Sequence, residues 1–439
     1  MLCRRRTADT EVRTVWQPLL RGPIADRALE AIGAIANAVR PVGVPRTRAR
    51  PVTTTARDAS LAGGTAGLAV FYGYLSLAKL GAQSEKRALR LLAEAQDAVA
   101  SVTMAASLYG GFSGVAWAMA HLEETPFDRN GGNSTSEVDQ TLSRYLNRAG
   151  WAGEYDLVSG LVGLGVYALE RLPAPAAIGC LEGIVDRLAE TAVRRAGGVT
   201  WFTPPELLPD SHLKKCPRGH YNLGLAHGVP GVIVVLGAAC TAGIRPRKAR
   251  RLLDGAVAWL LRHKRTDERG SRFSAWISPG SERESCRSAW CYGDPGVAVS
   301  LLCAARSVGE PEWEREAVEI ARAAATRSPD EAGVMDAGLC HGAAGLGHLF
   351  NRMYQATGDE ELGRAARFWF DRTLEMRQPR RGIGGFRTLA ATEDGTRYWS
   401  NEEGILTGAS GIALALLAAT TPIGPGWDRM LLLSTRNLD

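Results

Sequence analysis

The sequence repeats a Gly-x-x-Gly turn seven times, and an apolar stretch follows each copy. The turns read GTAG, GFSG, GLVG, GVPG, GDPG, GAAG and GASG, and subtracting the positions of their first glycines gives intervals of 47, 49, 68, 65, 49 and 66 residues. Such an interval holds about two helices of ordinary length with their loops. The sequence therefore predicts seven helical hairpins, whose turns begin at Gly64, Gly111, Gly160, Gly228, Gly293, Gly342 and Gly408.

The stretches after the turns differ in pattern from the segments between them. Runs such as VIVVLGAAC, VAVSLLCAA and IALALLAA are apolar on all sides, which is typical of buried helices. Segments such as EKRALRLLAEAQDAVASV and EPEWEREAVEIARAAATR place apolar residues at helical spacing and charges opposite. Buried and surface helices thus alternate, which predicts an all-α, double-layered ring, an α,α-toroid whose inner helices begin at the turns. We interpret the glycines as structural, since they permit tight backbone geometry and close approach.

The repeat also sets the expected domain organisation. A length of 439 residues suggests two or three domains, but a repeat that persists from Gly64 to Gly411 favours one closed toroid over 59–439. Residues 1–58 are rich in arginine and threonine around one expected helix, 25–39, and we interpret them as an N-terminal arm or an outer helix.

The longer intervals leave room for small insertions. Residues 197–222 are rich in proline and aromatic side chains, as a loop over an active-site mouth would be, although a plain surface loop fits equally well. Residues 272–276 and 385–399 have the pattern of extended or hairpin segments. We expect these insertions near the end of the ring that carries the active site.

Composition narrows the class of protein. A hydrophobic content of 45% with 22% charged residues is globular, and a net charge of +6 from dispersed basic residues gives little support for nucleic-acid binding. Eight cysteines without a secreted-scaffold spacing favour a reducing cytoplasm, and no apolar signal-peptide core follows the N-terminal arginines. Residues 404–427 carry no charge, but glycines and prolines interrupt them, which predicts a core helix rather than a membrane span.

Three residues with metal-binding side chains lie directly before the glycines of the fifth and sixth turns. Cys291 stands two residues before Gly293, and Cys340 and His341 immediately precede Gly342. Equivalent positions of equivalent repeats lie at one end of a ring, so these side chains can meet around one ion. Zinc prefers thiolate and imidazole ligands, and a catalytic zinc keeps three protein ligands and one open position. The residues alone also allow the cysteines to be buried apolar residues.

The ligand types indicate what such an ion would do. Two cysteinates neutralise the formal charge of Zn²⁺, so the site would be a weak Lewis acid that suits thiols. A thiol beside the metal loses its proton near neutral pH, yet its sulfur stays electron-rich. The residues therefore point to activation of a thiol as a nucleophile.

Four further residues share this end of the predicted ring. His227 stands at the same turn position in the fourth repeat, and an imidazole gives or takes a proton near neutral pH. Asp156, in the third repeat, can orient that imidazole. Arg287 and Tyr292 flank Cys291 and can stabilise negative charge on a carbonyl oxygen. Each residue alone has a structural interpretation, as a core histidine, a helix cap, an ion-pair residue or packing. Their arrival at one end with three metal-type residues favours function.

At these residues the sequence resembles the lanthionine synthetase C-like family, the lanthipeptide cyclases. The strings NLGLAHGVPG, CRSAWCYGDPG and LCHGAAG are similar to that family's signature motifs, and YDLVSGLVG and GILTGASGIALALL resemble its third and last repeat turns. The likeness covers nearly everything from about residue 58 onward, whereas residues 1–58 carry no matched motif. The resemblance implies a toroid with zinc held by Cys291, Cys340 and His341, surrounded by the functional residues Asp156, His227, Arg287 and Tyr292.

The resemblance also implies a reaction. Members of the family add cysteine thiols of a precursor peptide to dehydroalanine or dehydrobutyrine and form thioether rings. Our hypothesis is that the substrate thiolate attacks the alkene, Arg287 stabilises the enolate, and His227, held by Asp156, supplies the proton or first takes it from the thiol. Tyr292 positions the zinc ligand or the substrate carbonyl. The chain resembles a stand-alone class I cyclase, which implies a dehydrated precursor peptide, a separate dehydratase and an exporter as partners.

Two other functions stay open. A relative of the eukaryotic members would add glutathione to dehydrated residues in proteins, and the sequence separates that activity poorly from cyclisation. A non-catalytic peptide-binding scaffold with structural zinc is disfavoured because structural sites are usually closed by four protein ligands. Cys286 is the residue we would expect to supply a fourth ligand in that case.

Overall fold

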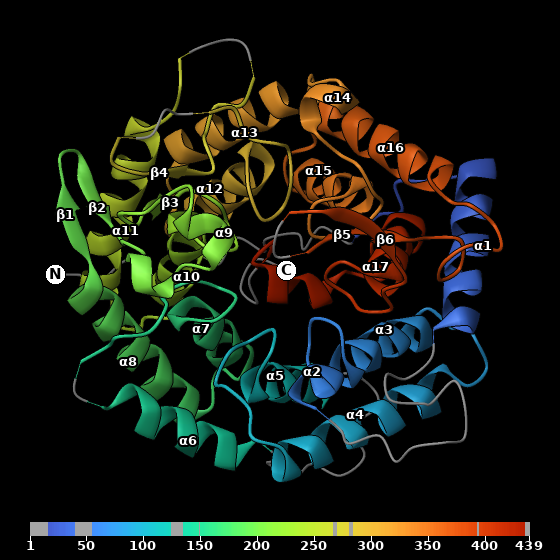
Figure 1. The fold of residues 1–439 in the computed structure, drawn as a ribbon, viewed down its shortest axis with the longest axis horizontal. Helices are drawn as coiled ribbons and strands as arrows, with labels where there is room; N and C mark the ends of the chain where they lie inside the picture. Colours follow the sequence, from blue (N-terminus) through green and yellow to red (C-terminus); the bar gives the residue numbers. More distant parts are fainter. Residues whose placement is uncertain are drawn as a thin grey trace, which may run out of the picture.

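Seven buried helices surround a central axis and form the inner layer of a ring (Figure 1). The computed structural model describes residues 16–39, 55–123, 135–148, 150–266, 270–280, 284–392 and 395–434. Neighbouring inner helices contact each other around the whole circle, and the last contacts the first. These helices are α3 (Thr65–Leu77), α5 (Phe112–Glu123), α7 (Leu161–Glu170), α10 (Val229–Thr241), α12 (Asp294–Val308), α15 (Ala343–Thr357) and α17 (Ala409–Thr420).

An outer layer of amphipathic helices covers the inner ring. Each outer helix buries one stripe; α4, for example, buries Ala88, Leu91, Ala95 and Ala98 and leaves its charged face in solvent. The outer helices are α4 (Ser84–Ser101), α6 (Ser136–Leu146), α8 (Pro175–Thr191), α11 (Pro246–Arg262), α13 (Pro311–Ala325), α16 (Glu360–Glu375) and α1 (Pro23–Ala38). The predicted α,α-toroid with alternating buried and surface helices is therefore confirmed.

Helix α1 completes the outer layer. The sequence predicted a helix over 25–39, and the structure places it at Pro23–Ala38, against α17 and α16. The last inner helix thus takes its outer partner from the start of the chain. Residues 1–15 and 40–54 lie outside the described residues, and the proposed domain boundary after residue 58 stays a prediction.

The second glycine of every turn packs against backbone, which explains why a side chain is excluded there. A Cβ atom at this position would overlap the carbonyl oxygen of the residue three places before the first glycine, in all seven repeats. Those carbonyls belong to Leu61, Leu108, Leu157, Leu225, Trp290, Leu339 and Ile405. Only Gly293 among the first glycines has a positive φ, 95°, a conformation that favours glycine directly after Cys291 and Tyr292.

Backbone hydrogen bonds join neighbouring turns into a chain around the ring. The N–H of Cys340 donates to Leu406 at 2.8 Å, and the N–H groups of Trp290 and Cys291 donate to the carbonyl of Cys340 at 3.2 and 3.4 Å. Further links run from Ala62 to Tyr109, from Leu157 to Ala226, from Ala226 to Cys291, and from Ile405 and Leu406 back to Ala62. Because these bonds involve the same part of each turn, they fix the turns in register at one end of the ring.

The C-terminal 3-10 helix η2 (Gly426–Leu431) fills the middle of the ring, in the darkest red of Figure 1. Its backbone carbonyls accept hydrogen bonds from the hydroxyl of Tyr109 and the indole N–H of Trp290, at 2.8 and 2.9 Å. Asp428, fully buried, receives hydrogen bonds from Arg352 and His348. A buried charge paired in this way holds the segment in one position.

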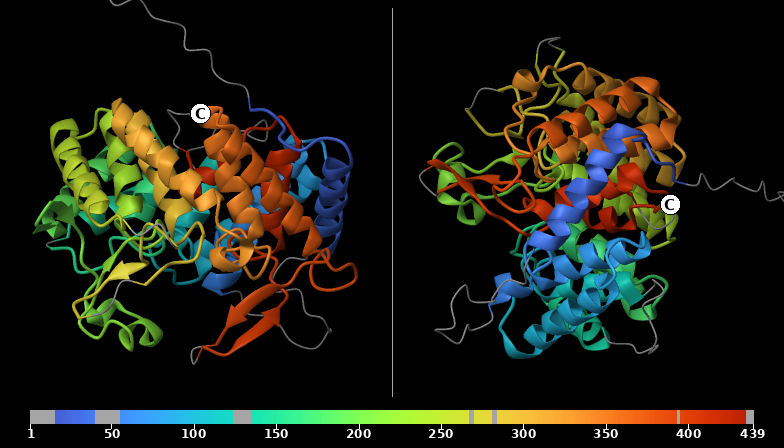
Figure 2. Two further views of the ribbon diagram at one scale, coloured as in Figure 1. Left: turned by 90° about the horizontal axis from the view of Figure 1, so that it is seen from above. Right: turned by 90° about the vertical axis from the view of Figure 1, so that its right-hand side faces the viewer.

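The insertions project from one end of the ring (Figure 2). Within the segment 385–399, predicted as extended or hairpin, strand Thr388–Ala391 pairs antiparallel with Arg397–Ser400, and residues 272–276 lead into a short antiparallel pairing, so both expectations are confirmed in outline. No helix in the described ranges is long and apolar enough to cross a bilayer. The remaining elements are α2 (Ala56–Ala59), β1 (Val193–Arg195), β2 (Gly198–Thr200), η1 (Pro205–Leu207), α9 (Asp210–Leu213), β3 (Tyr221–Asn222), β4 (Trp276–Ile277), α14 (Pro329–Ala332), β5 (Thr388–Ala391) and β6 (Arg397–Ser400).

Replacing a second glycine of a turn should destabilise the fold. The Cβ atom of Gly114→Ala would overlap the carbonyl of Leu108, so we expect a loss of about 1–3 kcal/mol from overpacking. Gly179→Ala is the matched control, because nothing lies within 4 Å of its Cβ position on the exposed side of α8, and it should be neutral or stabilising by about 1 kcal/mol. Thermal unfolding of both variants measures this, and equal midpoints would contradict the packing role.

Candidate metal centre

Three side chains from two neighbouring turns converge on one point. The ligand atoms of Cys291, Cys340 and His341 all lie within 4.8 Å of one another. Cys291 precedes α12, whereas Cys340 and His341 precede α15, so both turns present their ligands at helix N-termini. The partial positive charge of a helix N-terminus favours thiolate over thiol. The donors of this cluster are those that the sequence predicted would meet.

The two thiols share a proton. A hydrogen bond from the Cys340 thiol, with further help from His341 and Arg287, holds the pKa of Cys291 well below its ordinary value. That hydrogen bond raises the pKa of Cys340 in turn. The hydrogen bond therefore favours a thiolate on one of the two sulfurs, and a bound cation would favour a thiolate on both.

The donor set fits a zinc ion with one open position. Within the described residues, Cys286 is not part of the cluster, and burial raises the pKa of its thiol to about 12, which disfavours it as a ligand. Each cysteine in the described part of the chain is free of a disulfide. The soft donors and their number match a catalytic zinc site.

His227 and Asp156 form a pair on the adjoining turns. Nδ1 of His227 lies 2.6 Å from Oδ2 of Asp156, and the other oxygen of Asp156 accepts the backbone N–H of Ser159 at 2.8 Å. Asp156 therefore also caps its own turn, as the structural interpretation of this residue expected. Its side chain is 6% exposed and that of His227 is 39% exposed, and Nε2 of the imidazole is the ring nitrogen that Asp156 does not bind.

The aspartate decides the charge of this histidine. Burial alone would lower the pKa of His227, but the hydrogen bond and the negative charge of Asp156 outweigh it, so the pKa of His227 is raised. The surroundings of the imidazole therefore favour its protonated form. An imidazolium beside the metal cluster can donate a proton, and after donation it can take one back.

Tyr292 and Arg287 complete the predicted group. The ring of Tyr292 stacks on that of His227 with 5.9 Å between centroids, and burial raises the pKa of its phenol, which keeps its proton. Arg287 lines a cavity together with His341; its charge helps to lower the pKa of Cys291 and partly opposes the rise in the pKa of Cys340. All seven residues singled out from the sequence thus lie together at one end of the ring.

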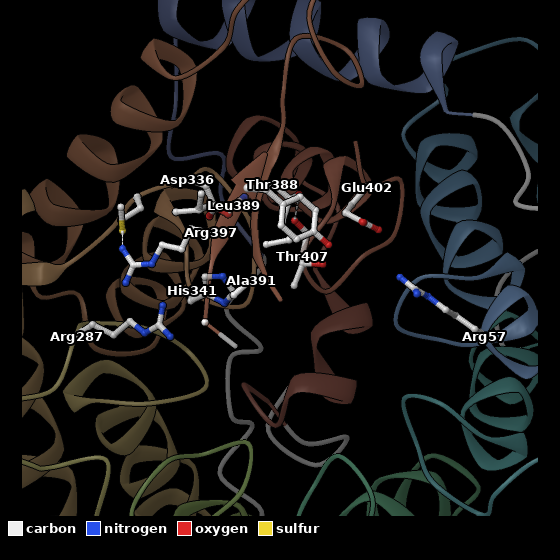
Figure 3. A pocket seen from close by; sticks show the side chains of 14 residues that line it. Arg57, Arg287, Asp336, His341, Thr388, Leu389, Ala391, Arg397, Glu402 and Thr407 are labelled. Carbon is white, nitrogen blue, oxygen red and sulfur yellow. Dashed lines mark hydrogen bonds between the residues drawn. The ribbon is translucent and has the colours of Figure 1, made fainter. Parts of the chain in front are cut away.

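A cavity of about 560 Å³ borders the cluster. Figure 3 shows Arg287 and His341 close together on one side of the cavity and Arg57 on the other. The hairpin formed by β5 and β6 covers part of it, and the backbone N–H of Leu389 donates to Oδ2 of Asp336 at 3.0 Å, which ties the hairpin to the sixth turn. The space is large enough for a peptide side chain and its neighbours.

Sequence reasoning missed several polar residues at this end. They stand six residues before the first glycine of their turn, the position that Arg287 holds in the fifth repeat: Asp58, Glu154, Asn222, Asp336 and Glu402. Burial, with the charge of Asp156 adding to it and that of His227 opposing it, raises the pKa of Glu154 to about 7. The shared offset from the glycine is the signal that could have found them.

The molecule is a toroid of seven helical hairpins, with a cluster of two cysteines and one histidine and a His-Asp pair at one end of the ring. The model of the lanthionine synthetase C-like protein family matches residues 55–432. The chain belongs to that family.

Two relatives extend the comparison. The chain is 25% identical over 264 residues to nisin biosynthesis protein NisC of Lactococcus lactis subsp. lactis, an alignment that covers 55% of this chain and 60% of NisC's length. The solved structure of nisin cyclase superposes with a TM-score of 0.72 at 20% identity, over 93% of this chain and 97% of that one. At this identity the structural likeness shows the fold, and it agrees with the toroid described above.

Removing the charge of Asp156 should lower the pKa of His227. A raised folded-state pKa adds stability below the unfolded value of about 6.5, and this stability is lost as the pH rises through the raised value. Asp156→Asn should therefore cost more stability at about pH 6 than at about pH 9. Titration of the His227 ring by NMR measures the shift directly, with exposed Asp97→Asn as the control. An unchanged His227 midpoint in Asp156→Asn would show that the pair is not electrostatically coupled.

Proposed function

We propose that this protein is a zinc-dependent lanthipeptide cyclase. It would add cysteine thiols of a dehydrated precursor peptide to the β-carbon of dehydroalanine or dehydrobutyrine and so form lanthionine and methyllanthionine thioether rings. Family membership and the names of the two relatives, a nisin biosynthesis protein and a nisin cyclase, support this assignment. The observation that carries it is the convergence of Cys291, Cys340 and His341 beside the His227–Asp156 pair.

The residues Cys291, Cys340 and His341 would hold the zinc. When bound, the ion would lower the pKa of a substrate thiol and keep its sulfur nucleophilic. The cavity beside His341 gives the peptide access to this point, and Arg57, Arg287 and Arg397 make its lining partly basic.

The chain's own residues handle the charge and the proton of the addition. A carbon–sulfur bond forms at the β-carbon, the alkene π bond breaks, and negative charge moves to the carbonyl oxygen as an enolate. Arg287 stabilises that charge, and Tyr292 donates a hydrogen bond to it or positions the neighbouring ligand. His227 delivers a proton to the α-carbon, and Asp156 keeps the imidazole oriented and protonated. The thiol proton lost at the start restores the proton balance, so the product has the mass of the reactant.

The raised pKa of His227 favours its role as the acid of the addition. In the opposite order it would first accept the thiol proton, and both orders require the same side chain. The proposed partners are a precursor peptide with leader and core, a separate dehydratase and an exporter. The free cysteines of the described residues support a cytoplasmic location.

Zinc content tests the ligand assignment. We expect about one zinc ion per chain in the purified protein and much less in Cys340→Ala, because a three-ligand site that loses one thiolate binds weakly. Cys180→Ala is the matched control, since that buried cysteine lies in α8, outside the cluster, and its loss should leave zinc content unchanged. Elemental analysis by mass spectrometry gives the ratio. Full zinc occupancy in Cys340→Ala would refute the ligand set.

Loss of the imidazole tests the proton transfer. His227→Asn should keep the fold and the zinc but cyclise a dehydrated precursor at least about 100-fold more slowly, the usual effect of removing a general acid. Alkylation of unreacted thiols followed by mass spectrometry counts the rings, because cyclisation itself leaves the mass unchanged. His263→Asn, at the end of the outer helix α11, is the control.

The same assay separates the alternative functions. Addition of glutathione with an increase in product mass would identify a glutathione-adding enzyme. No reaction with either thiol, together with four protein ligands on the metal, would identify a structural zinc scaffold. Full cyclisation by His227→Asn would contradict the role of His227 while leaving the cyclase assignment intact.

A further inference from the structure

Asn222 lies buried beside Tyr292 and is hydrogen-bonded to it. It belongs to the string NLGLAHG, stands six residues before Gly228, and is 1% exposed. Its backbone is held by β3, in which Asn222 pairs with Trp276 of β4. A polar side chain buried at this position needs hydrogen-bond partners, and the identity of those partners is informative.

The hydrogen bonds of Asn222 leave its amide only one orientation. The backbone N–H of Gly224 donates to Oδ1 of Asn222 at 2.9 Å, so that atom must be the oxygen. The amide nitrogen Nδ2 therefore faces Oη of Tyr292 at 3.2 Å and Nε2 of His220 at 3.3 Å. The oxygen and nitrogen of an asparagine are otherwise easily exchanged, but here a backbone donor distinguishes them.

This orientation fixes the direction of both outer hydrogen bonds. An amide NH₂ group has two donors and no acceptor, so Oη of Tyr292 and Nε2 of His220 must both accept. His220 is therefore the tautomer that carries its proton on Nδ1. Burial, with His212 and His227 nearby, lowers the pKa of His220 to about 4, which agrees with a neutral ring.

Tyr292 consequently keeps its own proton for another partner. Its oxygen already accepts from Asn222, and across the described ranges Oη has no second hydrogen-bond partner. The ring cannot turn freely, because it stacks on His227 and meets the edge of Trp276 with 6.2 Å between centroids. A phenol held in this way, whose oxygen already accepts one hydrogen bond, has its own O–H left to donate.

We propose that Asn222 is a positioning residue that sets the hydrogen-bond polarity of Tyr292, so that the phenol donates to the substrate carbonyl oxygen on which negative charge develops. This inference rests on the proposed cyclase function. Arg287 would supply charge at that oxygen, and Tyr292 would supply a directed hydrogen bond. No covalent step involves Asn222, which acts only through Tyr292.

Replacing the amide nitrogen of Asn222 by an oxygen should reverse the direction of its hydrogen bond with Tyr292. In Asn222→Asp one carboxylate oxygen still accepts from Gly224, and the other accepts the proton of Tyr292, which is then unavailable to the substrate. We expect kcat for cyclisation to fall by about 100-fold, as for loss of one oxyanion donor, with KM for the dehydrated peptide changed by less than about twofold. Zinc content should stay unchanged. Asn147→Asp, the same chemical change at an exposed helix end, should react at the full rate.

A double-mutant comparison separates polarity from packing. In a Tyr292→Phe background, Asn222→Asp should slow the reaction no further, because the group through which Asn222 acts is gone. Losses that multiply would assign Asn222 a merely structural role and overturn the proposal, as would full activity of Asn222→Asp.

A spectroscopic measurement tests the polarity without any reaction. The tyrosine doublet in ultraviolet resonance Raman spectra reports whether a phenol oxygen donates or accepts, and the difference between the protein and Tyr292→Phe isolates the signal of Tyr292. We expect an acceptor signature in the protein and a donor signature in Asn222→Asp. An acceptor signature in both would overturn the proposal even if the variant were inactive. Failure of the unaltered protein to cyclise any dehydrated peptide would instead refute the proposed function.

Discussion

The carbonyl oxygen of Cys340 accepts hydrogen bonds from the backbone N–H groups of Trp290 and Cys291, and the candidate site depends on this contact. It locks the fifth turn against the sixth, which brings Cys291 beside Cys340 and His341. Equivalent bonds link most other pairs of neighbouring turns and hold them in register at one end of the ring. The glycines make this possible, because a Cβ atom at the second glycine would displace the backbone that carries the ligands. The packing that forms the ring thus also positions the residues of the candidate site.

The sequence predicted the layers of the ring and the placement of the seven candidate residues at one end of it, because both follow the turn repeat. A fixed offset from a glycine translates directly into a fixed place at one end of a toroid. Asn222 and Glu154 were not predicted, although they share the offset of Arg287 from the first glycine. Their importance depends on contacts with residues from other repeats. The bond from Asn222 to Tyr292 joins residues 70 positions apart, and no local pattern indicates it.

The sequence allowed an outer helix near the N-terminus but did not indicate which inner helix it covers. Helix α1 was predicted as a helix, but only its packing on α16 and α17 identifies it as the outer partner of the last repeat. The segment η2 has little helical periodicity, and its place in the centre is fixed by Asp428, whose partner Arg352 lies 76 residues away. The sequence does not distinguish a buried aspartate–arginine pair from an aspartate and an arginine on the surface, so this contact could not be predicted.

Zinc K-edge X-ray absorption of the purified protein tests the central claim most directly, namely that neighbouring turns hold a metal with one position left open. The account predicts a first shell of two sulfur atoms and one imidazole nitrogen from the protein, completed by one light atom that is not a protein ligand. A shell closed by a third cysteine or a second histidine would contradict it, and so would a protein purified with no zinc and unable to bind any.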